Sequence, residues 1–158
     1  CIRDSRQAEI EAVKPVIERL KETGWTFGSH TWGHIRLDSR PLESVQRDTV
    51  RWAEEVGSLV GPTNILFYPH GGRPDGDDWH STGPVFQYLQ SQGFRIFASV
   101  GINSFSYIKK DISAVICDRL HPDGTTLRNG KALEWYSQFY DAREIIDLDV
   151  RPDLGVTW

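Results

Sequence analysis

The chain has 158 residues, enough for one domain with a sizeable hydrophobic core. Hydrophobic residues make up 39% and charged residues 25% of it, and the net charge of -4 excludes bulk attraction to nucleic acid. No apolar run approaches the roughly 20 residues that a membrane-spanning helix needs. The composition therefore predicts a single globular domain over residues 1–158, with no membrane-spanning segment.

The first residues and the two cysteines bear on secretion, on the extent of the chain and on its thiol chemistry. The first residues, CIRDSRQAEIEA, are charged and lack the apolar core of a signal peptide. The chain begins at Cys1 and contains no methionine, so we expect it to be part of a longer protein. Cys1 and Cys117 are too far apart for a zinc ribbon or a disulfide scaffold. We expect one terminal thiol and one buried thiol.

The first half of the chain predicts a helix, a strand and a second helix. Apolar residues at helical spacing precede Gly24, which is placed to end the first helix. WTFGSH, residues 25–30, has the pattern of a short buried strand. DSRPLESVQRDTVRWAEEVGSLVG, residues 38–61, is the clearest helix, and Gly61-Pro62 end it. Trp52 lies on its apolar face and is expected in the core.

The second half continues the alternation. NILFYP, residues 64–69, is apolar throughout, which suits a strand covered on both faces. After a polar loop, GPVFQYLQSQG predicts a third helix that Gly93 ends. FRIFASVG and AVICDRL are the third and fourth strands, and residues 130–142 predict a weaker helix.

This alternation predicts a parallel α/β architecture. A doubly wound sheet and an α/β barrel both remain open on the pattern. In either fold, functional groups lie on the loops that follow the carboxyl ends of the strands. Three polar segments fall there, namely His30 to His34, residues 69–80 and residues 121–124.

His30 and His34 are the first candidates for chemistry. Imidazole nitrogen is a good ligand for zinc and its neighbours in the first transition row. A spacing of four would bring both rings to one ion if the chain turns helical after the strand, and Gly33 would ease a tight bend. The alternative is a pair of ordinary polar histidines.

Two segments resemble motifs of one family. GWTFGSHTWGH resembles the second motif of the polysaccharide deacetylases (carbohydrate esterase family 4, the NodB homology domain), a His-Ser/Thr-x-x-His after a glycine-led strand. ILFYPHGG resembles the third motif, and the two stand in the family's order. The resemblance covers most of the chain.

The resemblance implies a distorted (β/α)7-type barrel and a metal-dependent hydrolase. Its substrate would be an acetylated polysaccharide or oligosaccharide, such as peptidoglycan, a chitin-like chain or another cell-envelope glycan. The enzyme would remove N-acetyl or O-acetyl groups, and a secreted or cell-envelope location follows from the same resemblance.

The resemblance also implies roles for individual residues. His30 and His34 would bind a divalent metal, zinc first, with cobalt or nickel as alternatives. The family's third ligand and catalytic base are aspartates of a first motif that this chain does not show. We expect that motif and the first strand upstream of Cys1, since Asp4 lies in a helical lead-in. By this interpretation, the 158 residues alone have little activity.

The remaining site residues follow the third and last motifs. The backbone N–H of His70 would stabilise the tetrahedral oxyanion, and its side chain either lines the groove or is a plain loop histidine. His121 is the candidate general acid, or otherwise an exposed turn residue. Tyr68, Trp32 and Arg119 would contact substrate, although Arg119 could instead pair with a carboxylate.

The chain departs from the family pattern at one informative position. Phe67 stands where the third motif often has an arginine that braces the catalytic aspartate. Arg73 is a nearby substitute. Because the last motif is also irregular, two alternatives to an enzyme stay open. One is a non-catalytic glycan-binding relative, and the other is a structural α/β domain with incidental histidines.

The polar loop after the third motif has a less specific pattern. Its acidic residues and histidine lack the spacing of a calcium-binding EF-hand, so we expect a solvated loop that caps the next helix. Its tryptophan is a further candidate for sugar stacking. These residues are Asp75, Asp77, Asp78, Trp79 and His80.

Overall fold

The fold is taken from a computed structural model that describes residues 2–76, 82–100, 107–109 and 113–119, with Glu134, Ser137 and Gln138. Several predictions lie outside these residues. They concern Cys1, Asp77, Asp78, Trp79, His80, His121 and most of the helix expected over residues 130–142.

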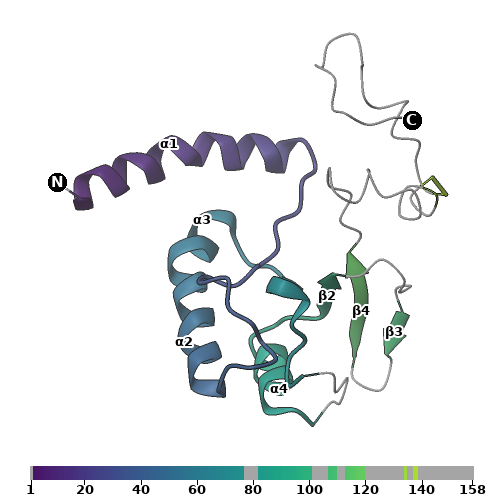
Figure 1. Cartoon of the computed structure of the whole chain (residues 1–158). Coiled ribbons are helices and arrows are strands. Elements are labelled where there is room, and N and C mark those ends of the chain that lie inside the picture. Colours follow the sequence, from purple (N-terminus) through teal and green to yellow (C-terminus); the bar gives the residue numbers. More distant parts are fainter. Residues whose placement is uncertain are drawn as a thin grey trace.

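The first helix, α1, runs from Ile2 to Glu22 and ends where the sequence predicts. Gly24 adopts a left-handed conformation with φ of 87°, which favours glycine. The N–H of Trp25 donates back to the carbonyl of Leu20 at 3.0 Å and closes the last turn. Figure 1 shows α1 lying across one end of the molecule.

The predicted second helix is confirmed as a continuous run of three pieces. It comprises α2 (Leu42–Trp52), a π-helical turn η1 (Ala53–Gly57) and the short α3 (Ser58–Val60). Gly61 follows with φ of 88° and ends the run. Trp52 is buried, as expected.

Within the described residues, the sheet has four strands in the order β1-β2-β4-β3. The strands β1 (Ile65–Phe67), β2 (Ile96–Val100) and β4 (Ala114–Arg119) are parallel neighbours. The strand β3 (Tyr107–Lys109) pairs antiparallel with β4 at the edge. The sequence predicted the parallel α/β architecture but not this antiparallel edge strand, because a three-residue strand is too short to show a period.

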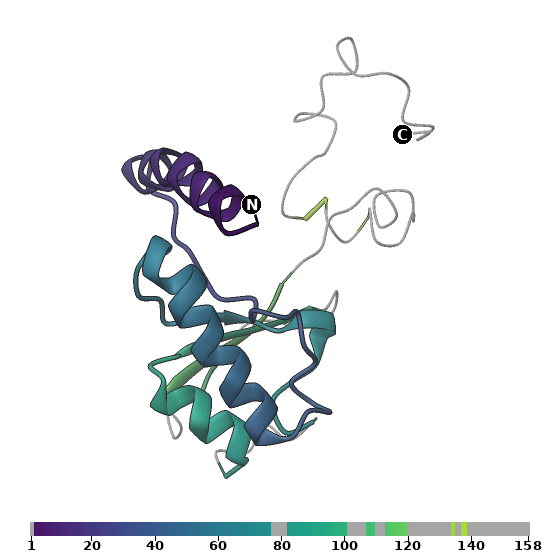
Figure 2. The same cartoon turned by 90° about the vertical axis from the view of Figure 1, so that its left-hand side faces the viewer.

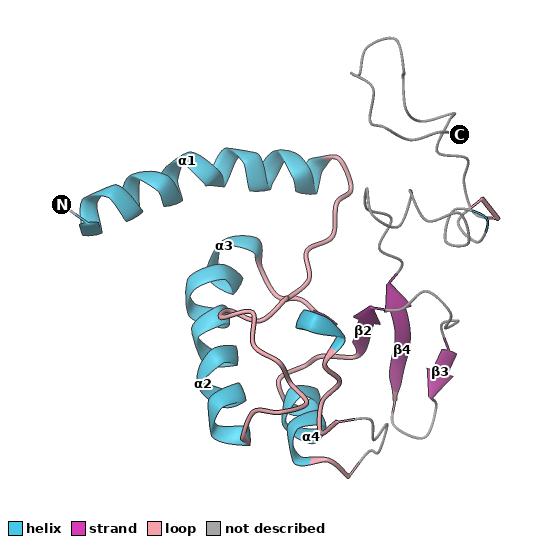
Figure 3. Cartoon of the chain, viewed as in Figure 1, coloured by secondary structure: helices cyan, strands magenta, loops and turns pink. Residues whose placement is uncertain are grey.

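The segment predicted as the first strand, residues 25–30, forms a single bridge to the described part of the sheet and no continuous strand. Ser29 pairs in parallel with Leu66, its N–H donating to Ile65 O at 2.9 Å and its carbonyl accepting from the Phe67 N–H at 2.8 Å. Figure 3 accordingly draws the stretch between α1 and α2 as a loop. Gly28 permits the approach, because a Cβ there would collide with the Phe67 ring.

The helices α2 and α4 (Pro84–Ser91) lie on the same side of the sheet (Figures 1 and 2). Leu66, Phe97 and Ile116 are aligned across β1, β2 and β4 and face these helices. They form one buried core with residues of both helices, including Val45, Val85, Phe86 and Leu89.

The strand order has a consequence for the fold class. From Ser29 through β1, β2 and β4, the parallel strands stand side by side in chain order, with helices on one side, and the antiparallel β3 lies outside β4. A doubly wound sheet reverses its strand order and places helices on both faces, and neither feature is seen in the described part of the chain. The domain is thus α/β with a small, mainly parallel sheet. Among the described residues, no helix combines the length and apolar content that a membrane span requires.

We predict that Phe97→Ala lowers the free energy of unfolding by about 3–5 kcal/mol, because the fully buried ring (0% exposed) would leave a cavity between sheet and helices. The matched control is Val100→Ala on the same strand, where the side chain is 42% exposed. It should change stability by at most about 0.5 kcal/mol. Urea unfolding measures both, and equal losses would contradict this core assignment.

Candidate active site

Three histidines from two segments meet beyond the carboxyl ends of the strands. The ring centroids of His30 and His34 are 4.8 Å apart, and those of His34 and His70 are 4.5 Å apart, both edge-to-face. His30 and His34 follow the Ser29 bridge, and His70 follows β1. The structure therefore brings together the three predicted site histidines that lie within the described residues.

The protonation of His30 follows from its backbone partner. Its Nδ1 lies 2.9 Å from the carbonyl oxygen of Phe67. A carbonyl only accepts, so Nδ1 carries the proton, and in the neutral form of the ring Nε2 is the nitrogen with the free electron pair. Metal-binding histidines are held in this way, with the second ring nitrogen donating to a carbonyl or carboxylate.

The loop from His30 to His34 does not turn helical, which corrects the expectation based on spacing. Thr31 and His34 adopt left-handed conformations, with φ of 60° and 51°. The Asp48 carboxylate on α2 accepts hydrogen bonds from the N–H groups of Trp32 and Gly33, at 2.7 and 2.8 Å. In a helix these two N–H groups would donate to carbonyls four residues earlier, whereas here both donate to the Asp48 side chain. A tight loop, and not a helical turn, therefore brings the two rings together.

Two hydroxyl groups complete the loop. The N–H of Thr31 donates to the buried Ser29 Oγ at 3.2 Å, and the N–H of Ile35 donates to Thr31 Oγ1 at 3.1 Å. The short polar residues between the histidines thus supply the local bonds that the sequence suggested.

The surroundings of His34 lower the pKa of its ring. Desolvation by neighbouring groups is the larger cause, although the residue is exposed, and the nearby His30 and His70 lower the pKa further. Desolvation and like charge both disfavour the protonated form. His34 is therefore expected to be neutral at neutral pH, the state in which imidazole binds a metal.

His70 lies in a strained turn after β1. It belongs to the single 3-10 turn η2 (Pro69–Gly71) and has a left-handed φ of 55°. Pro69 is buried while His70 is exposed, which directs the residue toward the other two rings. Non-glycine residues rarely adopt this conformation, and such strain is common at functional sites.

Arg119, expected to contact substrate or a carboxylate, instead binds backbone in the structure. Its Nη2 donates to Tyr68 O at 3.1 Å and its Nε to Ser99 O at 3.2 Å. Its guanidinium also lies over the Phe67 ring, 5.1 Å from the centroid. Burial lowers the pKa of this guanidinium, although the neighbouring Cys117 opposes the effect.

The two aromatic residues expected to contact substrate are placed differently from one another. The Tyr68 side chain is 2% exposed and packs in the core near Phe97, so its ring does not face a groove. This is a correction, and it arises because Tyr68 is on the helix side of the sheet with Leu66. Trp32 is 41% exposed.

The Trp32 ring is packed against the second helical run. The Arg51 guanidinium lies 3.5 Å from the ring centroid, and the indole N–H donates to Glu55 at 2.8 Å. One face of the ring is thus taken by a cation–π contact.

Arg73, considered as a brace for a catalytic aspartate, lies near Asp118 instead. Its Nη2 is 3.7 Å from Asp118 Oδ1, an ion-pair distance rather than a hydrogen bond. The Asp118 side chain is 3% exposed, and this oxygen has no hydrogen-bond partner in the described part of the chain. Sequence reasoning missed Asp118, because nothing in AVICDRL distinguishes it from an exposed strand-end residue.

The acidic loop caps a helix, as predicted. The two carboxylate oxygens of Asp75 accept the N–H groups of Val85 and Phe86, at 3.1 and 2.9 Å, in the first turn of α4. Gly83 makes room, because a Cβ there would overlap the Asp75 carboxylate. Asp75 thus stabilises the start of α4.

The chemical capacity of the site is bounded by its ligand count. In the part of the chain that the structure describes, no three His, Cys, Asp or Glu side chains are arranged to hold a metal ion. The histidines thus offer a partial ligand set. Cys117 is half-buried and free, and burial raises the pKa of its thiol, which keeps it protonated.

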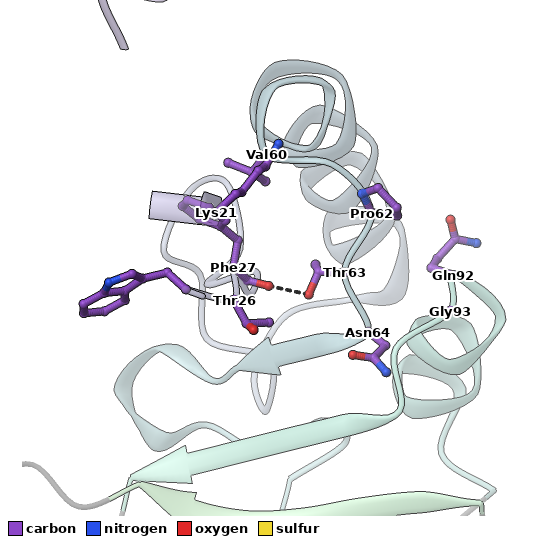
Figure 4. Close-up of a pocket in the computed structure, with 10 residues that line it drawn as sticks. Lys21, Thr26, Phe27, Val60, Pro62, Thr63, Asn64, Gln92 and Gly93 are labelled. Atoms are coloured by element: carbon purple, nitrogen blue, oxygen red, sulfur yellow. Dashed lines mark hydrogen bonds between the residues drawn. The ribbon is translucent and has the colours of Figure 1, made fainter. Parts of the chain in front are cut away.

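One cavity lies away from the histidines. It measures about 580 Å³ and is bordered by Lys21, Trp25, Thr26, Phe27, Val60, Pro62, Thr63, Asn64, Gln92 and Gly93. Figure 4 shows Thr63 donating to the Phe27 carbonyl (2.7 Å) within it. His30, His34 and His70 do not border this cavity, whose lining residues include those that lead into β1 and β2 rather than those at the carboxyl ends of these strands. We therefore place the candidate site by its chemistry and not by cavity size.

We predict that Asp48→Ala destabilises the folded chain by roughly 1–3 kcal/mol, since two backbone N–H groups lose a charged acceptor. The matched control is Glu54→Ala, which removes the same charge from an exposed position. Chemical denaturation should show the loss for Asp48 alone. In addition, hydrogen exchange of the Trp32 and Gly33 amides should accelerate in Asp48→Ala. Unchanged exchange would show that Asp48 does not hold these two N–H groups.

We predict that His34, in protein freed of metal, titrates below the ordinary histidine pKa of about 6.5. The depressed pKa contributes stability that is full above that value and is lost as pH falls through the pKa of the folded state. NMR titration of the ring protons measures it. His30→Gln should raise the His34 pKa only in part, because desolvation is the larger cause. A His34 pKa above that of an exposed histidine would overturn this picture.

Comparison with known proteins gives one match. Residues 5–95, more than half of the chain, match the model of the polysaccharide deacetylase family. No curated protein and no solved structure matches the chain. The matched segment contains both motifs on which the resemblance rests and all three clustered histidines. The chain belongs to the polysaccharide deacetylase family.

Proposed function

We propose that this chain forms part of a metal-dependent hydrolase that removes acetyl groups from a polysaccharide, with His30 and His34 as metal ligands. The observation that supports this most directly is the meeting of the two imidazoles at the carboxyl ends of the strands in a member of the deacetylase family. N-acetyl groups of peptidoglycan, a chitin-like chain or another envelope glycan are the proposed target, with O-acetyl esters as a second possibility. A secreted or cell-envelope location accompanies this proposal.

The ring geometry is compatible with one shared ion. Zinc–nitrogen bonds of about 2.0–2.1 Å place two imidazole centres roughly 5 Å apart when both rings bind one ion. The His30 and His34 centroids are 4.8 Å apart. Nδ1 of His30 donates to Phe67 O, so in the neutral ring Nε2 is the nitrogen left to bind the ion. We propose zinc as the ion, with cobalt or nickel as alternatives.

The reaction needs help because an amide is a poor electrophile and water a poor nucleophile. A bound divalent cation supplies Lewis-acid chemistry, polarising the acetyl carbonyl and making water more acidic. His30 and His34 would hold the ion, and the Asp48 carboxylate keeps the loop between them in shape.

Other residues of the chain take the proposed supporting roles. The backbone N–H of His70 would stabilise the negative oxygen of the tetrahedral intermediate, on a turn fixed by buried Pro69. His121 would return a proton to the departing amine. We assign the catalytic base and a third ligand to residues outside the described ones. Within the described residues, no acidic side chain completes the ligand set.

We also propose that the described sheet is an arc of a (β/α)7-type barrel. The support is that its parallel strands β1, β2 and β4 stand side by side in chain order, with α2 and α4 on one side. The opposite face carries half-buried apolar residues, among them Ile65, Ile96 and Val115, which in a barrel point to the interior.

A non-catalytic glycan-binding role is the second candidate. Phe67 stands at the position of the family's arginine, and Arg73 lies near Asp118. Such a relative would bind oligosaccharide, and a metal through the same rings, without hydrolysis.

We predict that the full-length protein releases acetate from acetylated chitooligosaccharide or peptidoglycan. His30→Gln or His34→Gln should lower kcat/KM by at least the roughly 10–100-fold that loss of an outer-shell partner costs a metal site. His80→Gln, a histidine of the polar loop, is the matched control and should be close to wild type. Acetate assays and metal analysis of each variant measure this.

The outcomes separate the candidates. Full acetate release by His30→Gln would rule out the ligand assignment. Tight binding of the oligosaccharide by wild-type protein without acetate release would favour the glycan-binding role.

A further inference from the structure

Arg119 spans the carboxyl ends of two neighbouring strands. Its Nη2 donates to the carbonyl of Tyr68, just beyond β1, at 3.1 Å. Its Nε donates to the carbonyl of Ser99 in β2, at 3.2 Å. Because Arg119 is itself the last residue of β4, a single side chain ties together the ends of β1, β2 and β4.

The Phe67–Tyr68 segment is held from both sides. The Phe67 N–H donates to Ser29 O at 2.8 Å, and the Tyr68 N–H donates to Ala98 O at 2.8 Å. Arg119 then fixes the Tyr68 carbonyl and lies over the Phe67 ring, 5.1 Å from its centroid. The peptide between Phe67 and Tyr68 therefore has little freedom to rotate.

That peptide carries the oxygen that orients His30. The Phe67 carbonyl accepts the proton of His30 Nδ1 at 2.9 Å. Were the peptide to rotate, this acceptor would turn away, and His30 would be free to carry its proton on Nε2 instead. The ring tautomer thus depends on how firmly the end of β1 is held.

We propose that Arg119 is a positioning residue for His30, which fixes the Phe67 carbonyl and thereby keeps the His30 proton on Nδ1. The consequence for metal binding rests on the proposed function, whereas the hydrogen-bond chain itself does not. By this assignment Arg119 acts through Phe67 and touches neither metal nor substrate.

The role calls for arginine rather than any cation. A guanidinium presents donors in a rigid planar fork, so Nε and Nη2 reach two carbonyls on different strands at once. A lysine ammonium is a compact charge on a flexible stem and cannot reproduce that fork. Arg119→Lys should therefore rescue the variant only in part.

The test follows the His30 tautomer in metal-free, ¹⁵N-labelled protein at a pH where the rings are neutral. Long-range ¹H–¹⁵N spectra distinguish a proton on Nδ1 from one on Nε2. We expect Nδ1–H in the wild type and a mixture of tautomers in Arg119→Met.

Arg95→Met is the matched control. Arg95 also donates to two backbone carbonyls, those of Gln90 and Phe94, both at 2.7 Å, but it lies before β2 at the other end of the sheet. It should leave the His30 tautomer unchanged. A His30 spectrum in Arg119→Met identical to that of the wild type would overturn the proposal.

Two further measurements keep the test decisive. If Arg119→Met does not fold, Arg119→Lys decides, since a wild-type His30 spectrum there would equally refute the role. Titration with Co²⁺ alone should show about 10-fold weaker binding in the Arg119 variant than in Arg95→Met, the low end of outer-shell effects. Absence of Co²⁺ binding in every protein would count against the metal site, while the tautomer result would still judge Arg119.

Discussion

The hydrogen bond from His30 Nδ1 to the Phe67 carbonyl is the contact on which the candidate site depends. It joins the segment before α2 to the end of β1, two parts of the chain 37 residues apart. It also sets the chemical state of His30, because the bonded nitrogen keeps the proton and the other is left to bind.

That contact exists because the two segments approach very closely. Gly28 lacks the Cβ that would collide with the Phe67 ring, and the Ser29 bridge sets the register of His30 against β1. The glycine and the histidine two residues later therefore act together. A larger residue at position 28 would displace the site without touching a histidine.

The charged residues around the site mostly hold backbone in place. Asp48 accepts the N–H groups of the loop between the histidines, Arg119 donates to carbonyls at the strand ends, and Asp75 caps α4. Hydrogen bonds to charged groups are among the stronger ones in proteins, so these contacts suit loops that must keep unusual conformations. Thr31, His34 and His70 all have left-handed backbone conformations that such bonds help to maintain.

Much of this arrangement could be predicted from the sequence, and the rest could not for identifiable reasons. Helix ends at Gly24, Gly61 and Gly93 followed from local chemistry, as did the placement of His30, His34 and His70 at strand ends. The short strand β3 was missed because three residues carry no period. Asp48 and Asp118 were missed because their partners are far away in sequence. Tyr68 was assigned to substrate binding because it belongs to the third motif, whereas its alternation with Phe67 along the chain places its side chain in the core.

The central claim is that the imidazoles of His30 and His34 bind one cation, and X-ray absorption at the zinc edge tests it most directly. The zinc-loaded full-length protein should show scattering from at least two imidazoles at about 2.0–2.1 Å, and His34→Gln should show one fewer. An imidazole count that is zero, or that does not change in His34→Gln, would contradict the account.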